Sequence, residues 1–155
     1  MTVRVLFVCL GNICRSPLAE AALRAEAERI GLDVEVDSAG TGDWHVGQPP
    51  DRRAQAVARR NGADIARLRG RQVSRGDFER FDHIVAMDRE NLAALRRLRP
   101  EGGRAQLSLL LDHVTGREGK PVGDPYYGGP EGFETTWSDV AEGARALARK
   151  IADDQ

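Results

Sequence analysis

Hydrophobic residues along the chain fall alternately into short runs and into helical stripes. The apolar run at residues 3–8 leads to Gly11-Asn12, which predicts a buried parallel strand followed by a loop. Residues 17–30 are rich in alanine and are followed by Gly31, a pattern typical of a helix and its C-terminal stop. The amino-terminal segment therefore predicts a strand, a loop and a helix in succession.

The same alternation continues to the end of the chain. Further strands are predicted at residues 34–38, 83–87 and 106–111, and further helices after Pro50-Asp51 and after Asp88. The last helix has the clearest apolar stripe, which consists of Phe133, Trp137, Val140, Ala144, Leu147 and Ile151. Strands that alternate with helices, with no linker or repeat between them, predict a single α/β domain over residues 1–155 with a parallel sheet.

The composition narrows the classes of function. The chain has 155 residues and a formal net charge of −1, which gives no electrostatic case for binding nucleic acid or a membrane. Its apolar runs are too short for a signal peptide or a membrane span. Two cysteines, both within the first 14 residues, cannot build a disulfide framework, so we expect a reducing, cytoplasmic setting.

The loop after the first strand carries the strongest chemical signal. Ser16 is predicted to be the N-cap of the helix and Pro17 its first residue, where a missing N–H costs nothing. The backbone N–H groups of the loop and the positive end of the helix dipole then converge on one small volume, which is how a helix N-terminus holds an anion. We therefore predict a phosphate-binding loop that consists of Leu10, Gly11, Asn12, Ile13, Cys14, Arg15 and Ser16.

Cys9 stands at the start of this loop and Arg15 at its end. Helix N-termini and nearby arginines favour the nucleophilic thiolate form of a cysteine. The planar fork of Arg15 matches two phosphate oxygens, and the Ser16 hydroxyl can point to the sulfur. A Cys and an Arg six residues apart are a weak pattern alone, and a free cysteine is usually a small buried hydrophobe. The strand end, the turn and Pro17 around them favour catalysis.

A thiolate that attacks a phosphate ester needs an acid for the leaving group, which is typically worth about 10²–10⁴ in rate. The three histidines share no metal-ligand spacing, and surface or satisfied polar roles are expected for His45, His83 and His113. Asp124 is the better candidate, although an Asp before Pro is often only a turn former.

Aromatic residues accompany Asp124 on a loop rich in glycine and proline. Tyr126 and Tyr127 are the only tyrosines of the chain, and together with Trp44 they are expected to wall an aromatic slot. The alternative for Trp44 is that it only anchors its own loop. The central stretch is also rich in arginine. These arginines form either a solvated face or a basic rim that recruits a phosphorylated substrate. They are Arg52, Arg53, Arg59, Arg60, Arg67, Arg69, Arg71 and Arg75.

With these residues in view, the chain resembles a low-molecular-weight protein tyrosine phosphatase of bacterial type over nearly its full length. The resemblance rests on the segments VCLGNICRSPLAEA, SAGTGDWHVG, GRQVS, MDREN and DPYYGG, in the order of that family. It implies a three-layer sandwich in which helices flank a four-stranded parallel sheet. It also implies a reaction that requires no metal or other cofactor.

The resemblance further implies roles for individual residues. Cys9 would be the nucleophile, Arg15 the phosphate clamp and Asp124 the general acid. Ser16 would be the partner of the thiolate, and Asn12 would brace the loop. The residues implied to contact the substrate ring and set specificity are Ile13, Trp44, Tyr126 and Tyr127.

Two positions need separate comment. Cys14 matches the second cysteine of the family, which is linked to a reversible disulfide that protects the nucleophile; a small loop residue is the alternative. Leu68 stands where relatives commonly have His, so a hydrogen bond that supports the site in those relatives is not available from this side chain.

The expected activity is hydrolysis of phosphotyrosine through a phosphocysteine intermediate. The implied partners are a tyrosine-phosphorylated protein and a cognate tyrosine kinase, and the chain is expected to act as a monomer; export without a signal peptide stays open. Three alternatives remain. An arsenate reductase needs further cysteines after Cys14, a phosphoarginine phosphatase typically has Thr at the position of Ile13, and a non-catalytic phosphate-binding module usually lacks Cys9, Arg15 or Asp124.

Overall fold

A computed structural model describes residues 2–155. Its centre is a parallel sheet with the strand order β2-β1-β3-β4, as the alternation of strands and helices predicted. The strands are β1 (Val3–Cys9), β2 (Val34–Gly40), β3 (His83–Ala86) and β4 (Gln106–Leu109). The helices are α1 (Arg15–Ile30), α2 (Arg52–Arg60), α3 (Asp77–Arg80), α4 (Arg89–Leu98) and α5 (Pro130–Asp153), with a 3₁₀ helix η1 (Leu110–His113) after β4.

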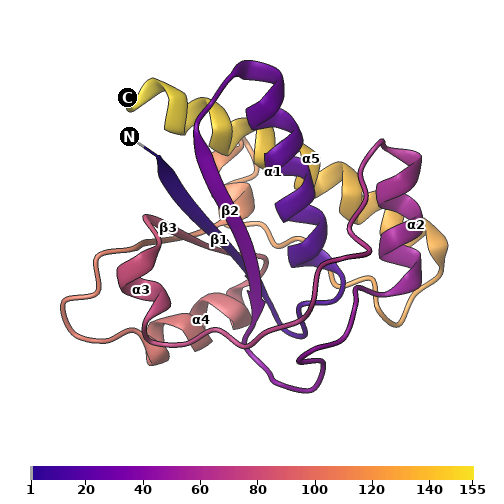
Figure 1. Ribbon diagram of the computed structural model, residues 1–155, viewed down its shortest axis with the longest axis horizontal. Helices are drawn as coiled ribbons and strands as arrows, with labels where there is room; N and C mark the ends of the chain where they lie inside the picture. The colour runs from indigo at the N-terminus through magenta and orange to yellow at the C-terminus, as the bar shows by residue number, and fades with distance from the viewer. Residues whose placement is uncertain (1) are drawn as a thin grey trace.

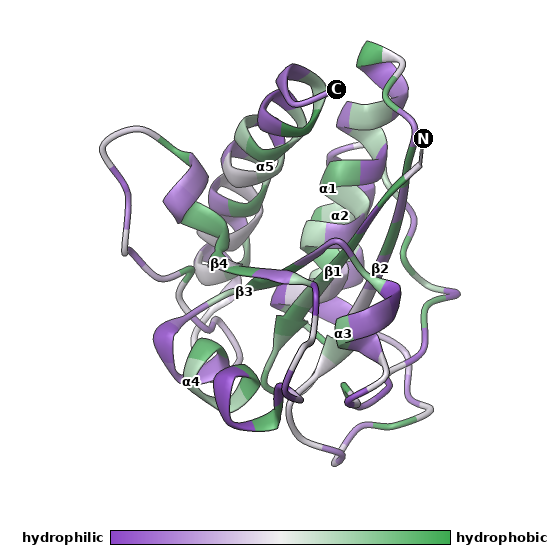
Figure 2. Cartoon of the chain, turned by 90° about the vertical axis from the view of Figure 1, so that its left-hand side faces the viewer, coloured by the Kyte–Doolittle hydropathy of each residue, from purple (hydrophilic) through white to green (hydrophobic). Residues whose placement is uncertain are grey.

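The alternation of side chains along β1 divides the core into two layers. Val5, Phe7 and Cys9 face the layer built with α1, α2 and α5, whereas Leu6 and Val8 face the layer built with α3 and α4. All of these side chains are buried, and Figure 2 shows the hydrophobic strands between the two helical layers. The register of β1 therefore places the Cys9 side chain on the α1 side of the sheet.

The carboxyl ends of the parallel strands lie at one end of the molecule, opposite the two chain termini (Figure 1). The loops that follow β1, β2 and β3 emerge at that edge. Ligands of open α/β sheets bind at such an edge. The fold therefore brings the loop after Cys9 close to segments distant in sequence.

Several element boundaries differ from the sequence-based predictions. β2 continues to Gly40, two residues beyond the predicted 34–38. The apolar run predicted as a strand at 106–111 leaves the sheet after Leu109 and turns into η1, because Leu110 and Leu111 are buried against the core without sheet pairing. Helix α3 was not predicted, since a four-residue helix has no periodicity to detect.

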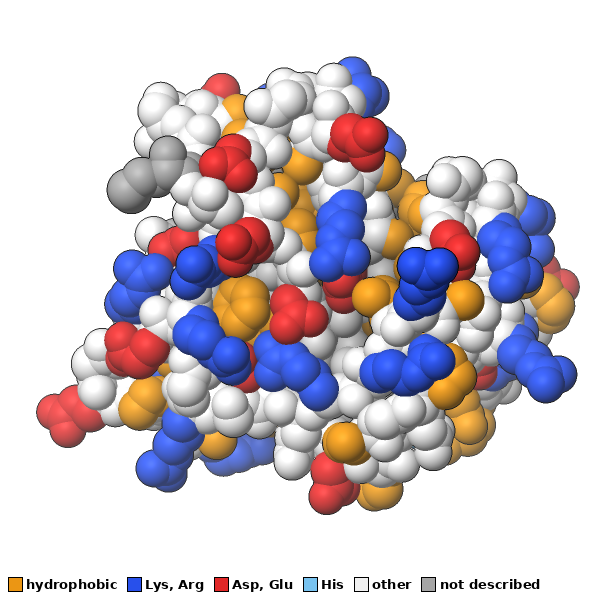
Figure 3. All heavy atoms as spheres, viewed as in Figure 1, with side chains coloured by type: hydrophobic (Ala, Val, Ile, Leu, Met, Phe, Trp, Pro, Cys, Tyr) orange, Lys and Arg blue, Asp and Glu red, His pale blue; other side chains and the backbone are white. Residues whose placement is uncertain are grey.

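The predicted stripe of α5 packs against the core. Trp137 is only partly buried at its edge, and Thr136 and Gly143 also contribute to the buried face. Charges of both signs are mixed across the face viewed in Figure 3, where arginines stand among acidic side chains. Within residues 2–155, no helix combines the length and the apolar character that crossing a membrane requires.

Candidate active site

The loop between β1 and α1 turns its carbonyl groups outward. Three of them accept backbone hydrogen bonds from neighbouring segments: Cys9 O from Thr41 N (2.9 Å), Leu10 O from Gly42 N (2.9 Å) and Ile13 O from Asp51 N (2.8 Å). In the described part of the chain, no backbone N–H of residues 10–15 donates to a protein acceptor. These N–H groups are therefore available to an anion at the start of α1.

Ser16 is not the N-cap of α1, contrary to the prediction. The helix begins at Arg15 with Cys14 in the cap position, so Ser16 and Pro17 lie inside the first turn. The Ser16 hydroxyl instead lies 3.1 Å from the Cys9 sulfur. Because Asn12 Nδ2 already donates to the Ser16 oxygen at 2.8 Å, the hydroxyl hydrogen can point to the sulfur.

Asn12 holds the loop in a left-handed turn with φ 59°, a conformation that asparagine tolerates better than most residues. Its Nδ2 donates to the hydroxyls of Ser16 and Ser38, the latter at 3.0 Å. Its Oδ1 accepts from the backbone N–H of Arg71 at 3.0 Å. These bonds support the loop without the side chain at position 68, where Leu68 packs against the core.

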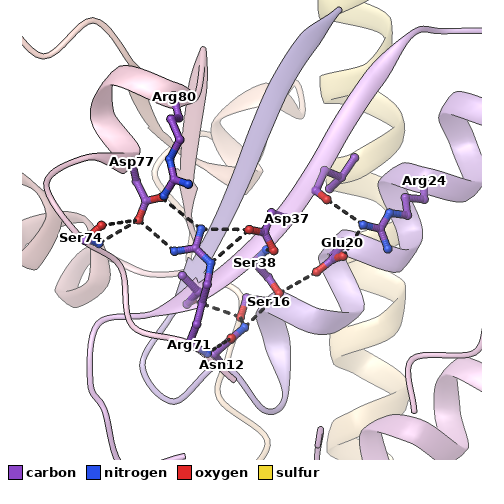
Figure 4. A network of polar contacts seen from close by, with 12 residues as sticks. Asn12, Ser16, Glu20, Arg24, Asp37, Ser38, Arg71, Ser74, Asp77 and Arg80 are labelled. Carbon is purple, nitrogen blue, oxygen red and sulfur yellow. Dashed lines mark hydrogen bonds and ion pairs between the residues drawn. The ribbon is translucent and has the colours of Figure 1, made fainter. Parts of the chain in front are cut away.

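The Arg71 side chain continues this support toward α3 (Figure 4). Its guanidinium pairs with Asp37 at 3.0 Å and with the fully buried Asp77 at 3.1 Å. Asp77 also accepts from the Ser74 N–H and from Arg80. Burial opposes the charge on Asp77, but the bonds from Arg71 and Ser74 prevail and lower its pKa.

A second branch runs from Ser38 into α1 (Figure 4). The Ser38 hydroxyl donates to the buried Glu20 carboxylate at 2.8 Å, and Arg24 pairs with the same carboxylate at 2.7 Å. Burial raises the pKa of Glu20 despite these partners. Polar side chains thus connect the loop between Cys9 and Arg15 with Glu20 and Arg24 of α1.

Arg15 is almost fully buried at the start of α1, with its guanidinium between two carboxylates. Its Nη1 donates to Asp88 Oδ2 at 2.7 Å and to the carbonyl of Val122 at 2.9 Å, and its Nη2 lies 3.6 Å from Asp124 Oδ2. Burial opposes its charge, but the Cys9 sulfur, Asp88 and Asp124 together raise its pKa. Arg15 is therefore a fixed cation beside the sulfur.

Asp88 lies at the site, although the sequence analysis named it only as the start of a helix and within the segment MDREN. It does cap α4, since its Oδ1 accepts from Asn91 N at 2.8 Å, and its other oxygen orients Arg15. Its position two residues after β3, the strand beside β1, was the signal that placed it at the same edge of the sheet.

The predicted residues meet around one cavity of about 310 Å³. Its lining consists of Cys9, Leu10, Gly11, Ile13, Cys14, Arg15, Trp44, His45, Asp124, Tyr126 and Tyr127. Asn12 and Ser16 are buried behind this lining rather than in it. Tyr127 is 96% exposed and Trp44 65% exposed, so these aromatic faces are open to a ligand.

His45 was expected to have only a surface or satisfied polar role, and that expectation was incomplete. Its Nδ1 is paired with Gln48 Oε1 at 2.8 Å, but the ring also lines the cavity next to Trp44. His113 has the satisfied role that was expected, with its Nε2 2.9 Å from the Ser108 hydroxyl. Among residues 2–155, no cluster of His, Cys, Asp and Glu has the arrangement of a metal site.

Cys14 lies in the same cavity as Cys9, and both are free thiols. Burial, with Asp51 and other negative neighbours, raises the pKa of Cys14. A thiol held in its protonated form is a poor nucleophile, so Cys14 is disfavoured as an attacking group. A protective disulfide between the two cysteines stays a prediction.

Comparison with known proteins agrees with this geometry. A family model described as "Low molecular weight phosphotyrosine protein phosphatase" matches residues 4–155. The chain belongs to this family. A low-molecular-weight protein-tyrosine-phosphatase of Streptomyces coelicolor is 49% identical, covering 99% of this chain and 96% of that protein.

Solved structures of family members have the same architecture. The crystal structure of YfkJ from Bacillus subtilis has a TM-score of 0.93 and 40% identity, covering 100% of this chain and 98% of that chain. A Drosophila arginine phosphatase of this fold has a TM-score of 0.90 and 35% identity, covering 97% of this chain and 99% of that chain. The fold and family predicted from the sequence are confirmed.

Proposed function

We propose that this protein hydrolyses phosphotyrosine in protein substrates, and small aryl phosphates, through a phosphocysteine intermediate. The observation that carries the proposal is the shared cavity, which is lined by the Cys9 sulfur, Arg15, Asp124 and exposed aromatic side chains. Membership of the phosphatase family supports it.

The first step transfers the phosphoryl group to sulfur. The Cys9 thiolate attacks phosphorus in line with the ester oxygen, while Arg15 and the N–H groups of the loop hold the other phosphoryl oxygens. The P–O bond to the tyrosine oxygen breaks, and Asp124 gives its proton to that oxygen. Tyrosine leaves as the neutral phenol.

The second step restores the enzyme. A water molecule attacks phosphorus, and Asp124, now a carboxylate, accepts its proton. The P–S bond breaks, inorganic phosphate leaves, and the thiolate returns to the donor Ser16. The same carboxyl thus acts first as an acid and then as a base.

Phosphoarginine is the second candidate substrate, because the chain is similar to a Drosophila arginine phosphatase. The apolar side chain of Ile13 lines the cavity together with Tyr126 and Tyr127, and this lining favours the ring of phosphotyrosine. Tyrosine is therefore the preferred substrate.

The test is release of inorganic phosphate from matched phosphotyrosine, phosphoserine and phosphoarginine peptides. We expect turnover of phosphotyrosine, and we expect Cys9→Ser to abolish it while retaining phosphate binding. Measurable hydrolysis by Cys9→Ser would defeat the covalent route, and phosphate binding without turnover by the native chain would make the protein a binding module. If the protein turned over phosphoarginine faster than phosphotyrosine, phosphoarginine would be its preferred substrate.

The biological setting follows from the substrate. A tyrosine-phosphorylated protein requires a kinase that makes it, so a cognate tyrosine kinase is part of the proposal. We infer a monomer that acts in the bacterial cytoplasm, where its two cysteines remain reduced.

A further inference from the structure

Arg53, in the first turn of α2, contacts the loop that carries Asp124. The loop spans residues 121–129 and has no helix or strand of its own. We propose that Arg53 is a positioning residue that holds this loop, and with it the acid Asp124, against the phosphate-binding loop. This inference rests on the proposed function, because it concerns the acid step of that reaction.

On one side, Arg53 is fixed to the phosphate-binding loop through Asp51. The backbone N–H of Asp51 donates to the carbonyl of Ile13 at 2.8 Å. The Asp51 carboxylate then accepts from Arg53 Nε and Nη2, each at 3.0 Å, and caps α2 by accepting from the Arg53 N–H at 2.8 Å. A two-point pair of this kind fixes the plane of the guanidinium.

On the other side, the same guanidinium forms hydrogen bonds to the loop at residues 121–129, which carries Asp124. Its Nη2 donates to the carbonyl of Tyr126 at 2.9 Å and its Nη1 to the carbonyl of Gly128 at 3.1 Å. The guanidinium carbon also lies 5.6 Å from the ring centre of Tyr126 and 4.6 Å from that of Phe133, within the range of cation–π contacts. Arg53 therefore fastens the loop to both α2 and the start of α5.

The last link reaches the acid itself. The Tyr126 N–H donates to Asp124 Oδ1 at 3.1 Å, so the peptide that Arg53 holds is adjacent to the one that orients the carboxyl. The other carboxyl oxygen faces Arg15 at 3.6 Å. Asp124 is 41% exposed at its side chain, so fixed neighbours rather than burial must keep it within reach of the leaving oxygen.

The experiment compares kcat/KM for a series of aryl phosphates, from nitrophenyl phosphates to phenyl phosphate. Asp124 matters most where the leaving phenol is least acidic. We expect Arg53→Met to lower kcat/KM for phenyl phosphate about tenfold, a fraction of the 10²–10⁴ that an acid supplies, with little loss on the most acidic phenol. The inhibition constant of inorganic phosphate should stay the same, because the backbone bond from Asp51 to Ile13 is retained.

Two further variants separate positioning from a general effect on the fold. Arg53→Lys keeps the charge without the fork and should fall between the native chain and Arg53→Met. Arg60→Met removes another exposed arginine of α2, one that pairs with Glu134, and should leave the leaving-group dependence unchanged. In an Asp124→Asn background, Arg53→Met should add no further dependence on the leaving group.

The outcomes distinguish this inference from the proposed function. If the native chain releases no phosphate, or Cys9→Ser still does, the proposed function fails. If turnover depends on Cys9 but Arg53→Met loses the same factor on every aryl phosphate, or loses nothing, only the positioning role is overturned. An effect of Arg53→Met that persists in full without the Asp124 carboxyl would overturn it as well.

Discussion

The Cys9 sulfur and the Ser16 hydroxyl meet at 3.1 Å inside the first turn of a helix. A serine two residues earlier, at the cap position, would accept a backbone N–H of the helix. Here the cap position belongs to Cys14, and the hydroxyl is left for the sulfur. The side chain thus faces the Cys9 sulfur and does not cap the helix.

Ser16→Ala tests this assignment. A hydrogen bond to a charged group is worth about 1.5–3 kcal/mol, so we expect breakdown of the phosphocysteine, in which the thiolate leaves, to slow about tenfold to a hundredfold. Burst kinetics on an aryl phosphate measure this step separately from sulfur attack. An unchanged steady-state rate in a folded variant would remove Ser16 from this role.

Asp124 is tested by its exchange for Asn, which keeps the shape of the side chain and removes its proton. We expect kcat/KM for phenyl phosphate to fall about 10²–10⁴-fold, and the loss to shrink as the leaving phenol becomes more acidic. Equal losses on all aryl phosphates would show that Asp124 is not the acid.

At the level of elements, contacts from segments distant in sequence hold the loop between Cys9 and Arg15 in place. Helix α3 has only four residues, yet its buried Asp77 holds the Arg71 side chain whose backbone braces Asn12. A helix that is too short to be stable alone is thus held by ionic bonds and in turn supports the site. This support couples the stability of the fold to the geometry of the loop.

Asp77→Asn should therefore destabilise the protein. Removing one partner of a buried pair costs about 3–5 kcal/mol, and we expect roughly 3 because Arg71 is partly exposed. The folded-state pKa of Asp77 is lowered, so its contribution is present above the unfolded value of about 4 and is lost as the pH falls through the folded value. Urea unfolding at neutral and acidic pH measures both effects.

The pH dependence is the discriminating part of that measurement. The stability difference between the native chain and Asp77→Asn should shrink as the solution is acidified, because the native carboxylate is then protonated too. A difference that stays constant down to acidic pH would mean that the charge on Asp77 is not what stabilises this connection.

At the level of the whole molecule, α5 closes the core over α1, α2 and η1. It packs tightly on η1 at Gly143, where an added Cβ would lie 2.4 Å from Leu110 Cγ. The glycine is inside a long helix, where it costs about 1 kcal/mol relative to alanine. The close packing of α5 on η1 is the reason for it.

Gly143→Ala is expected to lower the melting temperature despite the better helix propensity, since overpacking costs about 1–3 kcal/mol. In a Leu110→Ala background the clash is absent, and the same exchange should then be neutral or stabilising. Thermal unfolding of the native chain, of each single variant and of the double variant completes this double-mutant cycle. Equal effects in both backgrounds would contradict this account of the packing.

The sequence by itself determined the order of the strands and of the longer helices, the loop from Cys9 to Arg15, and most of the residues that line the shared cavity. These follow from local patterns: the apolar run before Cys9, the loop from Cys9 to Arg15, and a capping Asp at the start of α2 and α4. Only the tertiary structure decided which distant groups fix that site. Asp88 contacts Arg15, Arg71 contacts Asn12, and Arg53 contacts the loop at residues 121–129. These contacts join residues that are 59 to 75 positions apart in the chain. No local pattern records such a contact, because it depends on the sheet register and on how the helices pack.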